Sequence, residues 1–138
     1  MLSADPRTAT VLLVEDDPVT RELAVQILQA GGFAAVAAPT GERALLALRE
    51  VGAAFDWLVT KADLPGLVCG FVVADEFRTR RPGRPVVLTS DRLAATGSAP
   101  RGAIVARERA PYDLLDILRG LAAMAALAGQ AKAAARAA

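Results

Sequence analysis

Val11-Leu12-Leu13-Val14-Glu15-Asp16-Asp17-Pro18 runs from four apolar residues directly into three carboxylates and a proline. Valine and leucine favour a buried strand, and proline suits the first position of a helix. We therefore expect a strand that ends in acids and turns at once into a helix, with Asp17 as the N-cap. In open α/β folds, ligands bind at the carboxyl ends of the strands. Carboxylates crowded at that edge need a cation, which a metal, a lysine or an arginine can supply.

Length and composition favour a single folded domain. The chain has 138 residues, of which 54% are hydrophobic, and a net charge of +1 that gives no general attraction to nucleic acid or acidic lipid. One cysteine, Cys69, excludes an internal disulfide and favours a reducing compartment. Residues 1–10 lack the apolar core of a signal peptide, and the late apolar run 121–129 is too short to span a membrane. We expect a cytoplasmic protein that binds neither nucleic acid nor membrane.

The chain contains no histidine. This excludes histidine-dependent triads, zinc sites with histidine ligands and a role as a phosphohistidine carrier. In addition, no glycine-rich phosphate loop follows the first strand, and no pair of nucleophile and base is visible. An enzyme is therefore the least favoured reading of this sequence.

Short apolar segments alternate with helical patterns along the chain. This alternation predicts an α/β fold, a doubly wound parallel sheet of five strands with helices on both faces. The expected strands are 11–14, 33–38, 55–60, 85–89 and 103–105, and 61–70 is expected to be a loop. The first two helices are expected to turn these residues inward: Leu23, Ala24, Ile27 and Leu28, then Ala44, Leu45, Leu48 and Val51. We expect a flexible leader at 1–9, one domain at 10–121, and an alanine-rich helical tail at 122–138 that extends the last helix.

Several motifs resemble the receiver domain of two-component response regulators, over about residues 10–121. Glu15 and Asp16 match the acidic pair that binds metal in that family. The family's third strand and following loop are matched by Asp56-Trp-Leu-Val-Thr-Lys61-Ala-Asp63-Leu-Pro65-Gly66. Its fourth strand is matched by Arg81-Pro-Gly-Arg-Pro-Val-Val-Leu-Thr89-Ser90. Its Lys-Pro-aromatic signature falls on Ala110-Pro111-Tyr112. The resemblance implies a flavodoxin-like, CheY-like receiver fold and a role in two-component signalling.

The same resemblance shows where the chemistry departs from the family. In receivers the phosphoacceptor aspartate lies four residues before the loop proline, and counting back from Pro65 gives Lys61. The family's lysine before the later proline is replaced by Ala110, and its aromatic switch residue by Arg107. Only the hydroxyl at Thr89 remains from the back half of the site.

A lysine at position 61 cannot form an acyl phosphate, and its ammonium competes with Mg²⁺ for the carboxylates. Two carboxylates and one ammonium leave a local charge of about −1, against about −2 for the family's set, which weakens metal binding. Sheet-edge geometry places Lys61 within reach of Glu15 and Asp16, and the alternative is a lysine that points to solvent. We expect no cofactor, and any residual Mg²⁺ site would be Glu15 and Asp16.

Other candidate residues have plainer interpretations. Asp63 is the alternative phosphoacceptor, although it lies where the family presents a backbone carbonyl. We expect Asp56 to mark the start of a strand without chemistry, Trp57 to be core, and Cys69 to be inert rather than a redox sensor.

The leading functional interpretation is a stand-alone degenerate receiver that works without phosphorylation. It would be an interaction module that binds a histidine kinase, a phosphotransfer protein or another receiver. Its candidate interface lies beside the last helix and consists of Arg107, Glu108, Arg109 and Tyr112. The alternative is that this charged run is simply a surface exposed to solvent. The alternative function is a phosphoaccepting single-domain response regulator that uses a carboxylate such as Asp63. The surplus apolar surface at 114–128 is either alanine exposed to solvent or a dimer face.

Overall fold

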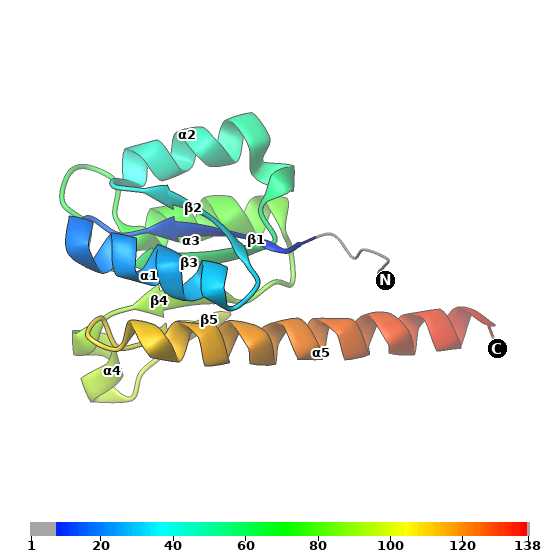
Figure 1. Ribbon diagram of the computed structural model, residues 1–138. Coiled ribbons are helices and arrows are strands. Elements are labelled where there is room, and N and C mark those ends of the chain that lie inside the picture. The colour runs from blue at the N-terminus through cyan, green and yellow to red at the C-terminus, as the bar shows by residue number, and fades with distance from the viewer. Residues whose placement is uncertain (1–7, 138) are drawn as a thin grey trace.

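The computed structural model describes residues 8–137, which form a parallel sheet between two layers of helices (Figure 1). The sheet has five strands in the order β2-β1-β3-β4-β5, so the predicted fold class is confirmed. Its strands are β1 Thr10–Val14, β2 Ala34–Ala38, β3 Trp57–Lys61, β4 Val86–Thr89 and β5 Ala103–Ala106. The predicted leader lies almost entirely outside the described residues.

Helices cover both faces of the sheet. On one face lie α1 (Pro18–Ala30) and α5 (Pro111–Ala137), and on the other lie α2 (Gly41–Val51) and α3 (Gly70–Arg80). The short helix α4 (Asp91–Thr96) packs beside β5 at the edge, and a 3₁₀ turn, η1 (Gly52–Ala54), follows α2.

The strand β1, which lies inside the sheet between β2 and β3, is buried on both faces. Leu12 and Val14 belong to the core shared with α2 and α3, whereas Val11 and Leu13 belong to the core shared with α1 and α5. A parallel strand between two helical layers reads as a continuous apolar run, which explains why this segment is the clearest in the sequence. Burial of its side chains thereby fixes where the acids that follow them lie.

Polar caps start the two helices that follow β1 and β2. The side chain of Asp17 accepts a hydrogen bond from the amide of Thr20 at 2.7 Å, and that of Thr40 accepts one from the amide of Arg43 at 3.1 Å. These caps satisfy amides that have no partner inside the helix, and the cap at Asp17 is the one stated above as a prediction.

Three local predictions are wrong. Leu23 is 37% exposed because the inward stripe of α1 is centred on Ala24 and Leu28, and Val51 is 54% exposed because α2 ends there in the 3₁₀ turn. Lys61 is the last residue of β3 rather than the start of a loop, since it pairs in register with Thr89 of β4.

The helix α5 continues without a break through the predicted tail. By length and composition it is the one described helix that could cross a membrane. Core helices of soluble proteins pass the same test, so this property is weak evidence for a membrane span. Its first turns are packed on the domain, with Leu114 and Leu118 buried, while residues 123–137 are exposed.

A glycine fixes the start of α3 against the end of β3. A Cβ at position 70 would collide with the backbone carbonyl of Lys61, which no side-chain movement can relieve. We predict that Gly70→Ala lowers the free energy of unfolding by about 1–3 kcal/mol in urea titrations. The control is Gly120→Ala on exposed α5, where a Cβ meets nothing and helix propensity increases; equal losses in both variants would contradict this packing.

Candidate functional site

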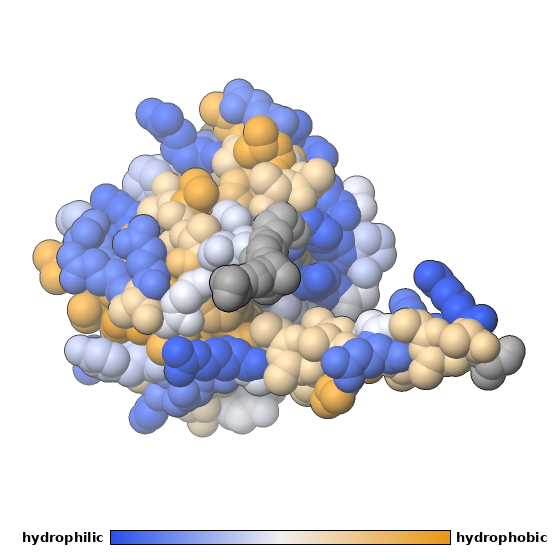
Figure 2. Space-filling model, turned by 45° about the vertical axis from the view of Figure 1, so that its right-hand side comes forward, coloured by the Kyte–Doolittle hydropathy of each residue, from blue (hydrophilic) through white to orange (hydrophobic). Residues whose placement is uncertain are grey.

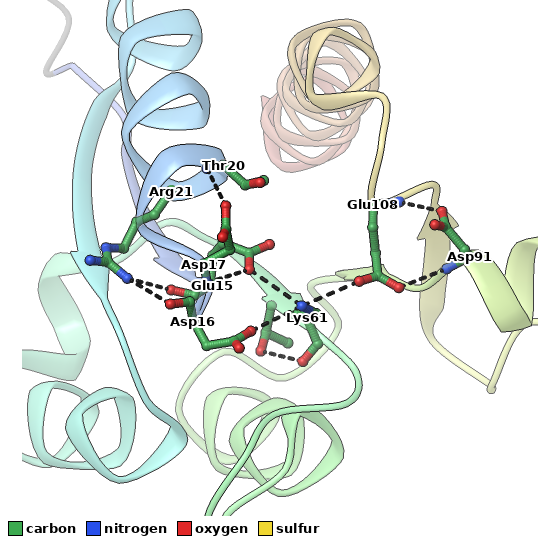
Figure 3. A network of polar contacts seen from close by, with 9 residues as sticks. Glu15, Asp16, Asp17, Thr20, Arg21, Lys61, Asp91 and Glu108 are labelled. Carbon is green, nitrogen blue, oxygen red and sulfur yellow. Dashed lines mark hydrogen bonds and ion pairs between the residues drawn. The ribbon is translucent and has the colours of Figure 1, made fainter.

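The ammonium of Lys61 lies between carboxylates at the carboxyl end of the sheet (Figure 3). Its Nζ atom is 3.0 Å from Oδ1 of Asp16 and 3.5 Å from Oε2 of Glu15. The lysine side chain is 20% exposed, so it is directed into the site and not into solvent. The contact predicted from sheet-edge geometry is present.

A third carboxylate, that of Glu108, approaches from the opposite side. Its Oε1 atom lies 3.4 Å from Nζ of Lys61, and the glutamate comes from the loop between β5 and α5. Glu108 is therefore turned toward the site, with a side chain 27% exposed, and is not simply part of the charged surface run.

Glu108 is held by a reciprocal pair of hydrogen bonds with Asp91. The amide of Glu108 donates to Oδ1 of Asp91 at 2.8 Å, and the amide of Asp91 donates to Oε2 of Glu108 at 3.0 Å. Since Asp91 is the first residue of α4, this pair joins the start of α4 to the loop before α5. Lys61 is thereby connected to both elements.

The first two carboxylates are also held in place. The amide of Asp17 donates to Oε2 of Glu15 at 3.0 Å. The guanidinium of Arg21 donates to the backbone carbonyls of Glu15 and Asp16, at 3.0 and 3.3 Å. These bonds fix the loop after β1 and add a second positive charge beside it.

The pKa of Lys61 is raised above its ordinary value. Burial alone would lower this pKa, but the hydrogen bond to Asp16, the charges of Glu15 and Asp16, and the bond to Glu108 outweigh burial. The lysine is therefore fully charged throughout the physiological range, and works as a fixed cation.

Glu15 and Asp17 show pKa shifts in opposite directions. Burial raises the pKa of Glu15, against the opposing effects of the Asp17 amide and the Lys61 charge. The bond from the Thr20 amide lowers the pKa of Asp17, which caps α1. The amide of Asp17 and the charge of Lys61 thus both favour the ionised form of Glu15, while the low pKa of Asp17 comes mainly from the Thr20 bonds.

The predicted local charge of about −1 is incomplete, because it omits Glu108. Three carboxylates and one ammonium leave −2 in the immediate cluster. Within residues 8–137, however, no group of three or more acidic or cysteine side chains is arranged to hold a metal ion.

The remaining predicted positions lie around this cluster. Thr89 is buried at the end of β4, while the side chains of Arg107 and Arg109 are 69% and 93% exposed and pair loosely with Asp113 and Asp91 at 3.7 and 3.5 Å. The two arginines line a surface hollow of about 590 Å³ between α4 and the loop before α5, together with Ala110. Tyr112 is 68% exposed.

The side chain of Asp63 is 63% exposed and pairs with Arg92 at 3.5 Å. Asp56 is buried, accepts a hydrogen bond from the amide of Thr10 at 2.8 Å and pairs with Arg81 at 3.7 Å, which are structural contacts. Trp57 is 3% exposed, as predicted for a core residue.

Sequence reasoning missed the roles of Arg21 and Asp91, and the inward direction of Glu108. Arg21 is four residues after Asp17, one helical turn into α1. The other two follow β4 and β5, whose carboxyl ends meet the same edge as β1 and β3. That shared edge is the signal that could have brought Asp91 and Glu108 into the predicted cluster.

The chain belongs to the response regulator receiver domain family, whose model matches residues 11–99. The cyclic di-GMP phosphodiesterase of Thermotoga maritima is 36% identical over 73 residues, which are 53% of this chain and 18% of that protein. This chain thus spans under a fifth of that relative's length, and the activity in its name belongs to that protein.

Solved receiver structures share the fold. The receiver domain of the hybrid histidine kinase CckA superposes with a TM-score of 0.70 at 23% identity, covering 82% of this chain and 98% of that one. A receiver domain protein from Clostridium thermocellum superposes with a TM-score of 0.73 at 19% identity, covering 86% of this chain and 98% of that one. TrrA from Thermotoga maritima, solved in complex with Mg²⁺-BeF, superposes with a TM-score of 0.64 at 21% identity, covering 83% of this chain and 99% of that one.

Removing the ammonium of Lys61 should make the stability of the protein depend on the protonation of Glu15. In Lys61→Met the pKa of Glu15 rises further, because burial remains and the compensating charge is lost. The folded state then holds a proton that the unfolded state releases, so stability falls as pH rises above the ordinary glutamate value of 4.5. We predict a loss of about 3 kcal/mol at neutral pH in urea titrations, shrinking toward pH 5.

The control for this variant is Lys132→Met on the exposed tail, which should leave the stability of the monomer unchanged at low protein concentration. A Lys61→Met protein that is as stable as wild type at neutral pH would show that the three carboxylates do not need the ammonium.

Proposed function

We propose that this protein is a degenerate receiver, a protein-interaction module of two-component signalling that works without phosphorylation. The observation that supports the proposal is the pairing of the Lys61 ammonium with three carboxylates, at the position where the resemblance puts the phosphoacceptor. An amine held this way cannot accept a phosphoryl group as an acyl phosphate. The module would therefore keep one state where a phosphorylated receiver alternates between two.

The alternative phosphoacceptor, Asp63, has little local support. Its exposed side chain pairs with Arg92 and is not among the partners of the cluster. Phosphoryl transfer to a carboxylate needs positive charge around the transferred oxygens. The lysine that supplies this charge in the family is replaced by Ala110 here, so we propose that the protein neither accepts phosphate nor catalyses a reaction.

We also propose that Mg²⁺ binds weakly or not at all. The two side chains that would coordinate the ion, Glu15 and Asp16, already contact Nζ of Lys61. A divalent cation would have to displace an ammonium attached to the same fold, and an unbalanced ammonium beside the ion repels it. The surplus negative charge from Glu108 offsets only part of that repulsion.

The candidate partner surface is formed by α4, β5 and the start of α5. Arg107, Arg109 and the exposed ring of Tyr112 lie on it, beside the hollow next to Ala110. Arginine and tyrosine are enriched in protein interfaces, and both arginines have only loose partners on this chain. We propose that this surface binds a histidine kinase, a phosphotransfer protein or another receiver in the cytoplasm, and that α5 supports a homodimer.

Titration with Mg²⁺ and beryllofluoride tests the locked state directly. We predict that the amide NMR signals of Asp16, Lys61 and Thr89 do not move in the wild-type protein, because the cation position is filled. A saturable, Mg²⁺-dependent shift in the wild type, centred on Asp63, would contradict the proposal.

The matched variant combines Lys61→Asp with Ala110→Lys, which restores the family's residues at both positions. We predict that this double variant responds to Mg²⁺ and beryllofluoride. If it folds and remains unresponsive, the pocket differs from the family in more than these two residues, and Lys61 is not what blocks the metal.

A further inference from the structure

The second half of α5 projects from the domain with little to cover it. Residues 123–137 are exposed on every side, and Figure 2 shows this part as a largely pale-orange rod beside the globular body. Two large apolar side chains stand on it, Met124 at 68% exposure and Leu127 at 64%. Exposed apolar surface of this kind marks an interaction site.

Charge is absent from the middle of this helix and present at both ends. The twelve residues 120–131 contain no charged side chain. Asp113, Asp116 and Arg119 precede them, and Lys132 and Arg136 follow them. The uncharged segment, residues 120–131, is therefore bounded by a mainly acidic start and a basic end.

We propose that the uncharged segment binds the same segment of a second copy of this chain in antiparallel orientation. Gly120, Met124, Leu127 and Ala131 follow one another at intervals of four, three and four residues, the spacing of a seam between paired helices. The small residues in this seam let the two helices approach closely. Packing buries Met124 and Leu127 of both copies.

The charges at the ends favour the antiparallel orientation. In that arrangement the acidic start of one helix lies beside the basic end of the other, and the two helix dipoles oppose each other favourably. A parallel pair would place acids beside acids and bases beside bases. Such end charges act within about 10 Å at moderate salt, which is the distance between packed helices.

The domain leaves room for the second helix. A hollow of about 470 Å³ lies between the tail and the loop Pro82–Pro85, and Met124 is the one residue of the seam that lines it, so the other seam residues face away from the hollow. A second copy is also a better occupant than a lipid bilayer. Although α5 is long and apolar enough to cross a bilayer by length and composition, its uncharged segment spans only about 18 Å of the roughly 30 Å apolar layer, so a spanning helix would bring charged residues such as Arg119 or Lys132 into that layer.

This inference specifies the homodimer within the proposed function, and it does not depend on the chemistry of Lys61. Sedimentation velocity of the full chain at increasing concentration tests it. We predict a reversible monomer–dimer equilibrium, and a dissociation constant at least about tenfold higher for Leu127→Lys. The control is Leu46→Lys on α2, a leucine that is 51% exposed, which should dimerise as the wild type does.

Charge reversal tests the orientation. Lys132→Glu should weaken the dimer, and adding Asp116→Lys should restore it, whereas in a parallel dimer Lys132→Glu replaces one pair of like charges by another and should leave the affinity about unchanged. A monomer at all concentrations, an unaffected Leu127→Lys variant, or a parallel pattern would each overturn the proposal. So would a chain that stays monomeric in solution and sediments with phospholipid vesicles. Failure of these tests would leave the beryllofluoride result untouched, so the two proposals fail separately.

Discussion

One ammonium surrounded by three carboxylates is the interaction on which the site depends. The acids come from the loop after β1 and from the loop after β5, while Lys61 is the last residue of β3. Without the lysine, burial and mutual repulsion would oppose ionisation of Glu15 in particular. With it, the adjacent strands β1 and β3 are joined by charge to the loop after the edge strand β5, at the carboxyl ends of the strands, where ligands bind in open α/β folds.

The cluster also reaches the surface. Through Glu108 and its paired bonds with Asp91, the position of Lys61 is tied to the start of α4 and to the loop before α5. These are the elements that carry the exposed arginines of the candidate partner surface. In the proposed function, the permanent cation of Lys61 holds these elements in place, a role that a transient phosphoryl group and metal have in a phosphorylated receiver. The partner surface would then keep a single conformation.

Much of this was predictable from sequence, for identifiable physical reasons. The apolar run of β1 and the caps at Asp17 and Thr40 are local signals, and the parallel sheet follows from the alternation of elements. The contact of Lys61 with Glu15 and Asp16 was predictable because the lysine and the two acids lie at the carboxyl ends of the neighbouring strands β3 and β1. The direction of the Glu108 side chain could not be predicted, because a charged residue in an exposed run can point to solvent or inward. Its hydrogen bonds with Asp91 fix that direction, and they are visible only in the structure.

The central claim is that Lys61 is held as a charged group by its three partners, and one titration tests it most directly. The chain has two lysines, Lys61 and Lys132, so its side-chain NMR spectrum contains two lysine signals that single substitutions assign. When the ¹³Cε shifts are followed from neutral to strongly alkaline pH, we predict that Lys61 titrates only above the ordinary lysine pKa of 10.5. Titration of Lys61 at or below that value, in the folded protein, would contradict it.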